Sequence, residues 1–226
     1  MRKIADRERV KVLQRFFKTG KGEYGEGDKF LGVTVPKLRE LAKKYQGIAL
    51  AEVKNLLHSK IHEERLLALL ILVSKFQVGK EQERGKIYNI YLKNTKYVNN
   101  WDLVDLSADK IAGEYLRGKS KNILYKLAKS KNLWERRIAI LATFNFIKDN
   151  KFSEALKIAE ILLEDKEDLI HKAVGWMLRE VGRRNTKSEE DFLKKHCQNM
   201  PRTMLRYAIE KFPKRKRFDI MKKWQS

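Results

Sequence analysis

The sequence predicts an all-α fold built from packed helix pairs, and three observations carry this prediction. Only three prolines occur in 226 residues, so long helices are allowed almost everywhere. Apolar residues recur three and four positions apart in several segments, which is the helical period. No alternating run of β-branched residues bounded by turn signals is present. We expect one domain over residues 1–226, because a chain of this length can bury a sizeable core.

The clearest helical patterns lie in four segments, which are 63–76, 101–116, 134–148 and 169–181. Shorter helical patterns between them supply the partner of each pair, at 86–95, 121–130 and 152–165. The three prolines, Pro36, Pro201 and Pro213, each lie near a predicted helix start or end. The elements therefore alternate along the chain as paired helices.

A charged residue followed by a small, apolar run recurs along the chain. The aligned positions are Arg65, Asp105, Arg137, Lys172 and Arg206. The steps between them run from 32 to 40 residues, a spacing typical of HEAT-like repeats. Such repeats stack into a curved solenoid, and we expect a concave groove lined by the second helix of each pair. Four cations and one acid would face this groove.

The composition favours a nucleic-acid partner. Lysine and arginine total 51 against 29 acidic residues, which gives a net charge of 51 − 29 = +22. Apolar residues make up 42% and aromatic residues 10% of the chain, which is too rich for a disordered basic tail. No stretch approaches the ~18 uncharged apolar residues of a membrane span. The predicted fold is therefore a helical solenoid whose basic concave groove faces phosphates.

Metal, cofactor and disulfide chemistry lack support in the sequence. Cys197 is the single cysteine, and the N-terminal segment resembles no signal peptide, so we expect a reducing cytoplasm. His58 and His62 lie four residues apart but lack a third metal ligand, and we expect both on a solvated helix face. The glycine run at 20–25 matches a dinucleotide fingerprint in letters only, because no strand precedes it, and we expect a loop.

The segment 169–183 has an unusual polar face. A helical projection gathers Lys172, Trp176, Arg179 and Arg183 opposite a broad apolar face. A tryptophan among cations can pack on nucleic acid while its neighbours contact phosphates. The alternative, which spacing alone favours, is that Trp176 packs against the next repeat.

The segment that begins at residue 101 concentrates acid on a basic surface. Asp102, Asp105 and Asp109 project close together, and Trp101 lies one helical turn before Asp105. A carboxylate held inside a cationic groove repels phosphate, and a catalytic role is one reason for its presence there.

A purely structural explanation for these acids is also open. Asn99 or Asn100 would cap the helix, and acids in its first turn would complement the helix dipole or pair with Arg136 or Arg137. This explanation accounts well for Asp102, only partly for Asp105 and poorly for Asp109.

Four strings of the sequence resemble those of the AlkD-like DNA alkylation repair proteins, a HEAT-like-repeat class of DNA glycosylases. They cover residues 21–45, 99–116, 133–141 and 171–185, in the order of the family, and the resemblance spans essentially the whole chain. Members of that family excise N3- and N7-alkylated purines, whose base carries a positive charge. The resemblance implies the same activity on duplex DNA.

The resemblance also implies roles for particular residues. Asp105 matches the catalytic carboxylate, and Trp101 and Trp176 match the aromatic residues beside the deoxyribose of the lesion. Arg137 matches a basic residue near the DNA backbone, and Tyr24 matches a tyrosine in the N-terminal part of the groove. We add four cations as expected phosphate contacts, Lys172, Arg179, Arg183 and Arg206.

The implied enzyme is a monomeric, monofunctional alkylpurine glycosylase that needs neither metal nor organic cofactor. The family leaves the damaged base stacked instead of flipping it into a pocket. Two other classes stay open: a non-catalytic binder of distorted or branched DNA, and a protein-interaction scaffold. Release of a base that depends on Asp105 would separate the enzyme from the DNA binder, and salt-insensitive DNA association would favour the scaffold.

Overall fold

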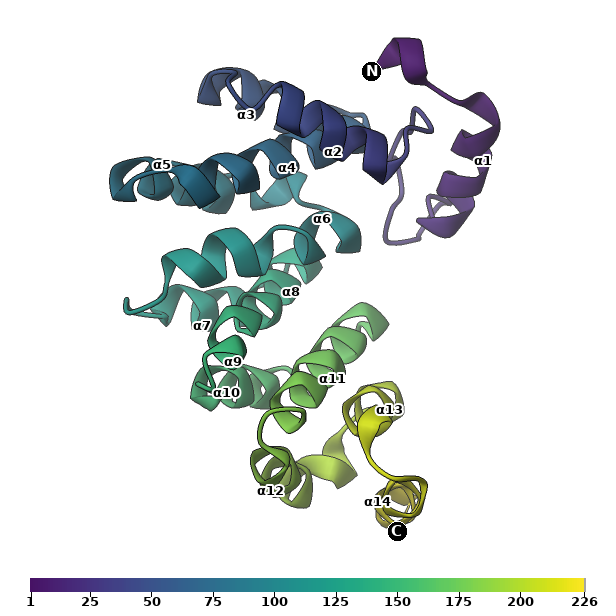
Figure 1. Cartoon of the computed structure of the whole chain (residues 1–226). Helices are drawn as coiled ribbons and strands as arrows, with labels where there is room; N and C mark the ends of the chain where they lie inside the picture. The colour runs from purple at the N-terminus through teal and green to yellow at the C-terminus, as the bar shows by residue number, and fades with distance from the viewer. Residues whose placement is uncertain (226) are drawn as a thin grey trace. The chain divides into compact units, whose positions relative to one another are not determined.

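The computed structural model describes residues 1–225, and its helices group into two compact units, Met1–Tyr115 and Leu116–Ser226 (Figure 1). Among the described residues no strand forms, and the one β pairing is an isolated bridge between Lys29 and Ile61. The all-α prediction is therefore confirmed. Within the same residues, no helix has the length and apolar character that a membrane crossing requires.

The first unit is organised around one long buried helix. Its α-helices are α1 (Arg7–Phe16), α2 (Val35–Lys44), α3 (Leu50–Leu57), α4 (His62–Val78), α5 (Glu81–Lys93) and α6 (Trp101–Asp105). Short 3₁₀ turns span Arg2–Ile4 and Thr95–Tyr97, and a π-helix spans Asp109–Gly113. Helix α4 packs against α2, α3 and α5 (Figure 1). It is therefore buried on several sides, from Leu66 to Phe76.

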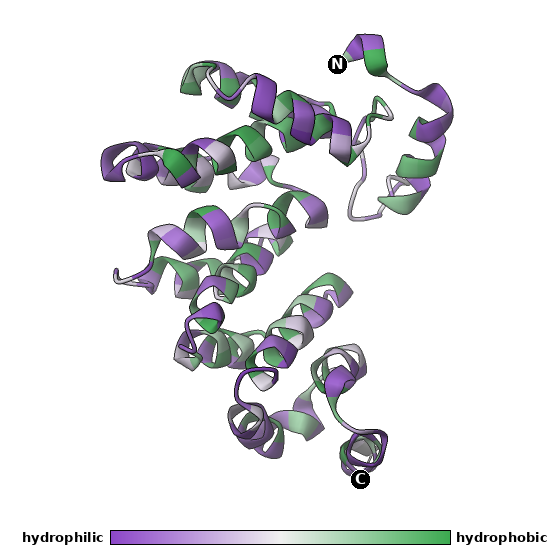
Figure 2. Ribbon diagram, in the orientation of Figure 1, coloured by the Kyte–Doolittle hydropathy of each residue, from purple (hydrophilic) through white to green (hydrophobic). Residues whose placement is uncertain are grey.

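The second unit is organised around α11 (Asp168–Gly182). The other helices are α7 (Asn122–Ala128), α8 (Leu133–Ala142), α9 (Phe144–Lys148), α10 (Ser153–Ile161), α12 (Thr186–His196), α13 (Arg202–Ala208) and α14 (Lys214–Gln225), with 3₁₀ turns at Cys197–Asn199 and Ile209–Lys211. Helix α11 packs against α8, α12 and α13. Hydrophobic and hydrophilic residues alternate along α11 with the helical period, as the sequence predicts (Figure 2).

Helix starts follow the local sequence signals. Each proline stands at the start of a helix: Pro36 lies in the first turn of α2, and Pro201 and Pro213 directly precede α13 and α14. Asparagine side chains cap two helices that matter below: Asn100 accepts a hydrogen bond from the Trp101 N–H, and Asn132 accepts one from the Trp134 N–H, each at 2.8 Å.

Two predicted helices are each broken by a buried hydroxyl, so their prediction as continuous helices over 101–116 and 134–148 is wrong. The Ser107 hydroxyl donates to the Leu103 carbonyl at 2.6 Å, and the Thr143 hydroxyl donates to the Ile140 carbonyl at 2.6 Å. A hydroxyl that bonds a preceding carbonyl competes with the helical ladder. Helix α6 therefore ends at Asp105, and the backbone resumes as the π-helix.

Candidate functional site

Two of the predicted catalytic residues lie at opposite ends of α6 and border the same cavity. Trp101 is the first residue of this one-turn helix and Asp105 is the last, and both side chains are half-buried. Both line a cavity of about 360 Å³ in the first unit. The i and i+4 spacing in the sequence therefore does bring the indole and the carboxylate to one wall.

The cavity wall around Trp101 is built of aromatic rings. The Trp101 indole stacks on the Phe17 ring with centroids 5.4 Å apart, and the Phe16 ring meets it edge-on at 5.7 Å. Phe17 in turn stacks on Phe30 at 5.3 Å. These rings come from the end of α1 and the segment before α2, so they fix the indole orientation from outside α6.

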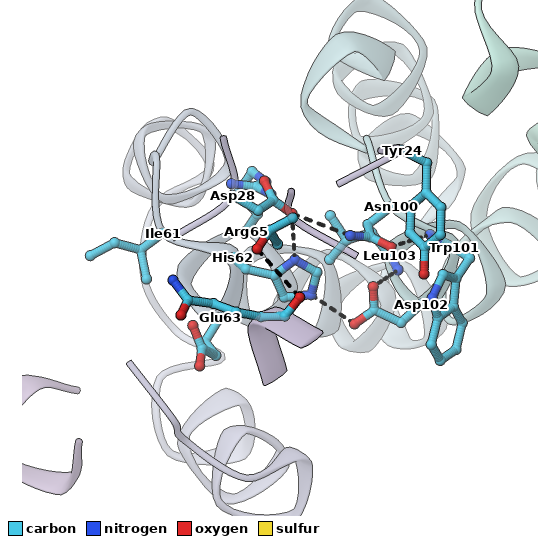
Figure 3. A network of polar contacts seen from close by, with 12 residues as sticks. Tyr24, Asp28, Ile61, His62, Glu63, Arg65, Asn100, Trp101, Asp102 and Leu103 are labelled. Atoms are coloured by element: carbon cyan, nitrogen blue, oxygen red, sulfur yellow. Dashed lines mark hydrogen bonds and ion pairs between the residues drawn. The ribbon is translucent and has the colours of Figure 1, made fainter. Parts of the chain in front are cut away.

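The buried His62 fixes the start of α6 through hydrogen bonds. The His62 Nε2 donates to the Asp102 carboxylate at 2.8 Å, and its Nδ1 donates to Asp28 at 3.1 Å. Asp28 also accepts from the Arg65 guanidinium at 2.6 Å and from the Asn100 amide at 3.2 Å. Figure 3 shows the imidazole between the two carboxylates. We call these five residues the His62 network, and all five residues are buried.

The His62 network carries a charged imidazole. Burial alone would lower the pKa of His62, but the hydrogen bonds and negative charges of Asp102 and Asp28 outweigh burial and raise this pKa to about 9. Burial alone would raise the pKa of Asp28, whereas His62, Arg65 and Asn100 bring that pKa below its ordinary value. At neutral pH both ring nitrogens of His62 therefore donate, as two carboxylate partners require.

Glu63 fixes the chain segment that carries the aromatic wall. Its carboxylate accepts hydrogen bonds from the backbone N–H groups of Leu31, Gly32 and Val33, the shortest at 2.8 Å to Gly32. The backbone N–H of His62 donates to the Lys29 carbonyl at 2.8 Å, next to these contacts. The start of α4 therefore sets the path of residues 29–33 beside the cavity.

The prediction for the two histidines is wrong, and so is the expectation that the repeat cations Arg65 and Arg137 face an open groove, because both are buried. His62 is only 2% exposed and begins α4, whereas His58 directly follows α3 and bonds the Asn94 side chain at 2.6 Å, so the two do not share a solvated helix face. Arg65, expected to face an open groove, is buried because its guanidinium pairs with Asp28. The predicted loop at 20–25 is confirmed, since it lies between α1 and α2.

Asp105 lies within electrostatic range of a buried tyrosine. Burial raises the pKa of Tyr91, and the negative charges of Asp109 and Asp105 raise it further. The Tyr91 hydroxyl meets the Ser107 hydroxyl at 3.0 Å. The Tyr91 phenol therefore stays neutral, and it lies next to the Ser107 hydroxyl, which interrupts the helix after α6.

Tyr24 lies at the same end of the first unit as the aromatic wall. Its hydroxyl donates to the Phe16 carbonyl at 3.5 Å, and the Phe16 ring contacts Trp101. The Tyr24 side chain is half-buried and is drawn with the network in Figure 3. The structure thus brings Tyr24, Trp101 and Asp105 into one region of the first unit.

Trp176 lies in the second unit, where its ring is half-buried. The indole contacts Phe144 with centroids 6.0 Å apart, and the Lys148 ammonium lies 4.3 Å from the centre of the Phe144 ring. Packing therefore accounts for part of its surface, as the structural alternative expected, although the contact is with the earlier helix α9 and not with the next repeat. The rest of the ring stays exposed.

The predicted phosphate-binding cations differ in their surroundings. Arg137 is 5% exposed and donates to the Leu169 carbonyl, so its guanidinium serves the packing of α8 on α11. Arg179 pairs with Glu210, and Arg183 is largely exposed with Glu180 at 3.4 Å. Lys172 pairs with Asp168 at 2.7 Å, and Arg206 is exposed. Their contacts with DNA stay predictions.

Sequence reasoning missed the His62 network and Glu63. Asp102 lies in the first turn of its helix, where the helix dipole already favours an acid, so nothing in the sequence indicates its hydrogen bond to His62. The one usable signal was position: His62 begins a long segment rich in leucine, where a solvated histidine is out of place. Asp28 lies in a loop of small and charged residues that carries no such signal.

The chain resembles DNA alkylation repair proteins by sequence model and by structure. The family model described as DNA alkylation repair enzyme matches residues 1–212. A predicted DNA alkylation repair enzyme from Enterococcus faecalis is 17% identical with a TM-score of 0.71, over 93% of this chain and 97% of that one. AlkD2 from Streptococcus mutans is 17% identical with a TM-score of 0.58, over 92% and 98%.

A third structure, smu.31 from Streptococcus mutans UA159, is 18% identical with a TM-score of 0.54, over 91% of this chain and 98% of that one. At these identities the likeness is one of fold. No curated protein matches the sequence. The family model covers most of the chain, and on that ground this protein belongs to the DNA alkylation repair enzyme family.

Proposed function

We propose that this protein is a DNA glycosylase that releases N3- and N7-alkylated purines from duplex DNA. The observation that carries the proposal is the placement of Asp105 and Trp101 on one wall of an aromatic cavity, in a chain of the DNA alkylation repair family. The net charge of +22 supports a polyanionic substrate.

The chemistry needs little more than one carboxylate. A purine alkylated at N3 or N7 is already cationic, so its bond to C1′ breaks with the electron pair moving to the base, and no acid is needed to protonate the leaving group. Positive charge then develops on the deoxyribose. The Asp105 carboxylate stabilises this charge and orients the water that adds to C1′, and the water proton is released to solvent.

Trp101 adds a second favourable contact for the cationic sugar. An indole face near a cation contributes about 0.5–2 kcal/mol, and Phe17 and Phe16 hold this indole in place before substrate binds. Trp176 is proposed for a similar contact, on the family resemblance and on its half-exposed ring. The base itself is proposed to stay stacked, so bulky cationic adducts are expected to be released as well.

The decisive experiment incubates the protein with methylated duplex DNA and identifies any free base by mass spectrometry. Wild type is expected to release 3-methyladenine or 7-methylguanine, and Asp105→Asn is expected to lose about 10²-fold or more in rate while it still binds DNA. Glu40→Gln, which removes an exposed carboxylate from α2 of the same unit, is the matched control. Wild-type protein that binds DNA but releases neither base is instead a binder of DNA structure.

A further inference from the structure

The second unit contains an open groove of about 790 Å³ between α11, α13 and α14, which we call the α13–α14 groove. Six basic or aromatic residues line it, Lys172, Arg206, Tyr207, Lys214, Arg217 and Phe218, together with two acids, Asp168 and Glu210. Helix α14 contributes three of these six residues. It follows the segment that the family model matches, which ends at residue 212.

Three cations in this groove have no side-chain partner among the described side chains, which are those of residues 1–224. The side chains of Arg206, Lys214 and Arg217 make neither an ion pair nor a hydrogen bond in that part of the chain. By contrast, the groove cation Lys172 pairs with Asp168 at 2.7 Å. The other acid in the groove, Glu210, pairs with Arg179 and Lys211. The three unpaired cations therefore leave positive charge in the groove that the protein does not compensate, which favours an anionic ligand.

Two aromatic rings stand exposed between these cations. The Phe218 side chain is 69% exposed and Tyr207 is 38% exposed, and both line the groove. A phenyl ring left in water gains by covering its face, and the flat surface that best matches it is another planar ring. Unpaired cations interleaved with exposed rings are the surface that single-stranded nucleic acid binds.

Helix α14 is fixed in place, so the groove is formed before a ligand arrives. The Trp224 indole N–H donates to the Met200 carbonyl at 2.8 Å. Lys216 pairs with Glu190 on α12, and its ammonium lies 4.6 Å from the centre of the Phe212 ring. These contacts hold the side of α14 away from Phe218, which leaves Lys214, Arg217 and Phe218 facing the groove.

We propose that the α13–α14 groove binds a single strand of DNA, with phosphates on Arg206, Lys214 and Arg217 and an unpaired base stacked on Phe218. Cations alone would suit duplex and single strand equally, because both carry phosphates. The exposed rings distinguish the two, because the faces of bases in a duplex are already covered by stacking on the neighbouring base pairs, whereas an unpaired base has a free face. Binding at this groove is separate from base release at Asp105 and should tolerate any sequence.

The experiment measures binding of a fluorescent 12-nucleotide oligo-dT by anisotropy, over a series of salt concentrations, in the Asp105→Asn background. Phe218→Ala is expected to weaken binding by about 5- to 100-fold. Phe218→Leu is expected to bind almost as weakly as Phe218→Ala, because leucine lacks the ring on which a base stacks. Joint Lys214→Gln and Arg217→Gln substitution is expected to weaken binding and to lower the slope of log affinity against log salt by about 1.4, or 0.7 per phosphate.

Arg215→Gln is the matched control, because Arg215 carries the same charge on the same helix and is exposed but does not line the groove. It is expected to change oligo-dT binding little. The proposal is overturned if Phe218→Ala binds oligo-dT like wild type, if Arg215→Gln loses as much as the groove variant, or if Phe218→Ala weakens a 12-base-pair duplex equally. Release of methylated bases by Phe218→Ala, measured separately, reports on the glycosylase function alone.

Discussion

The Nε2 of His62 lies 2.8 Å from the Asp102 carboxylate, and this hydrogen bond joins the start of α4 to the one-turn helix that ends at Asp105. A helix this short has almost no stability of its own. Its direction is therefore set by the contacts of its first residues, to which His62 and Asn100 contribute hydrogen bonds from buried positions. The contribution of each contact to stability can be tested by mutation.

The charge of His62 is expected to stabilise the fold in a defined pH window. Because the folded pKa of about 9 lies above the ordinary value of 6.5, the stabilisation is fully present below pH 6.5 and is lost as pH rises through 9. His62→Gln cannot titrate. The difference between the thermal midpoints of wild type and His62→Gln should therefore be largest at pH 6 and shrink toward pH 10.

At pH 6 the loss for His62→Gln is expected to reach about 3 kcal/mol, since the change leaves a buried carboxylate without its charged partner. His58→Gln is the control, because His58 is half-exposed and its partner is the neutral Asn94 side chain. An equal, pH-independent loss in both variants would show that the His62 charge does not hold the network.

Asn100 is expected to contribute more than an ordinary helix cap. Asn100→Ala removes the bond to the Trp101 N–H and also the 3.2 Å bond to Asp28. Asn132→Ala removes the corresponding cap of α8 at the same 2.8 Å distance. Chemical denaturation should give a loss of about 1 kcal/mol for Asn132→Ala and about 2–3 kcal/mol for Asn100→Ala. Equal losses would mean that the bond to Asp28 adds nothing.

Glu189 is expected to destabilise the protein at alkaline pH. Burial raises its pKa to about 8, and its Oε1 has no hydrogen-bond partner among the described residues. The fold therefore favours the protonated form, so stability from this group is present below pH 4.5 and is lost as pH rises through 8.

Glu189→Gln stays neutral at every pH. It should melt like wild type near pH 4 and several degrees higher at pH 9, because about 1 kcal/mol moves the midpoint by roughly 2–4 °C in a chain of this size. Asp191→Asn, an exposed position on the same helix, is the control and should move the midpoint little at either pH. A lower midpoint for Glu189→Gln at pH 9 would contradict the prediction.

Gly175 permits the close approach of α11 and α13. A Cβ at this position would collide with the Met204 carbonyl and the Tyr207 side chain. Gly175→Ala should therefore destabilise by about 1–3 kcal/mol, although alanine favours helix by about 1 kcal/mol. Gly85→Ala in α5 is the control and should be neutral or stabilising, because the nearest atom is the movable Tyr115 hydroxyl at 3.2 Å.

The sequence predicted the helices and the local pairing of Trp101 with Asp105, because both depend on periods that neighbouring residues carry. Asn100 was foreseen as a possible cap for the same reason. The break at Ser107 was not foreseen, since a serine is compatible with a helix until its hydroxyl is buried against a carbonyl.

The His62 network could not be predicted because its members are far apart in the chain. Asp28 lies 34 residues from His62, and His62 lies 40 from Asp102. Asp28 alone has an ordinary explanation as a loop acid and Asp102 as a first-turn acid, and the position of His62 indicates burial without indicating its partners. Their combined charge becomes meaningful only when the fold buries them together.

The hydroxyl of Ser107 also affects how the protein tolerates mutation. Because α6 ends at Asp105, the carboxylate lies on a very short helix, and its orientation depends on side chains from other parts of the chain. A screen for inactive variants should accordingly recover substitutions at residues 28, 62 and 100 alongside those at 105. If the proposed function holds, such variants would release bases more slowly although Asp105 and Trp101 remained in the chain.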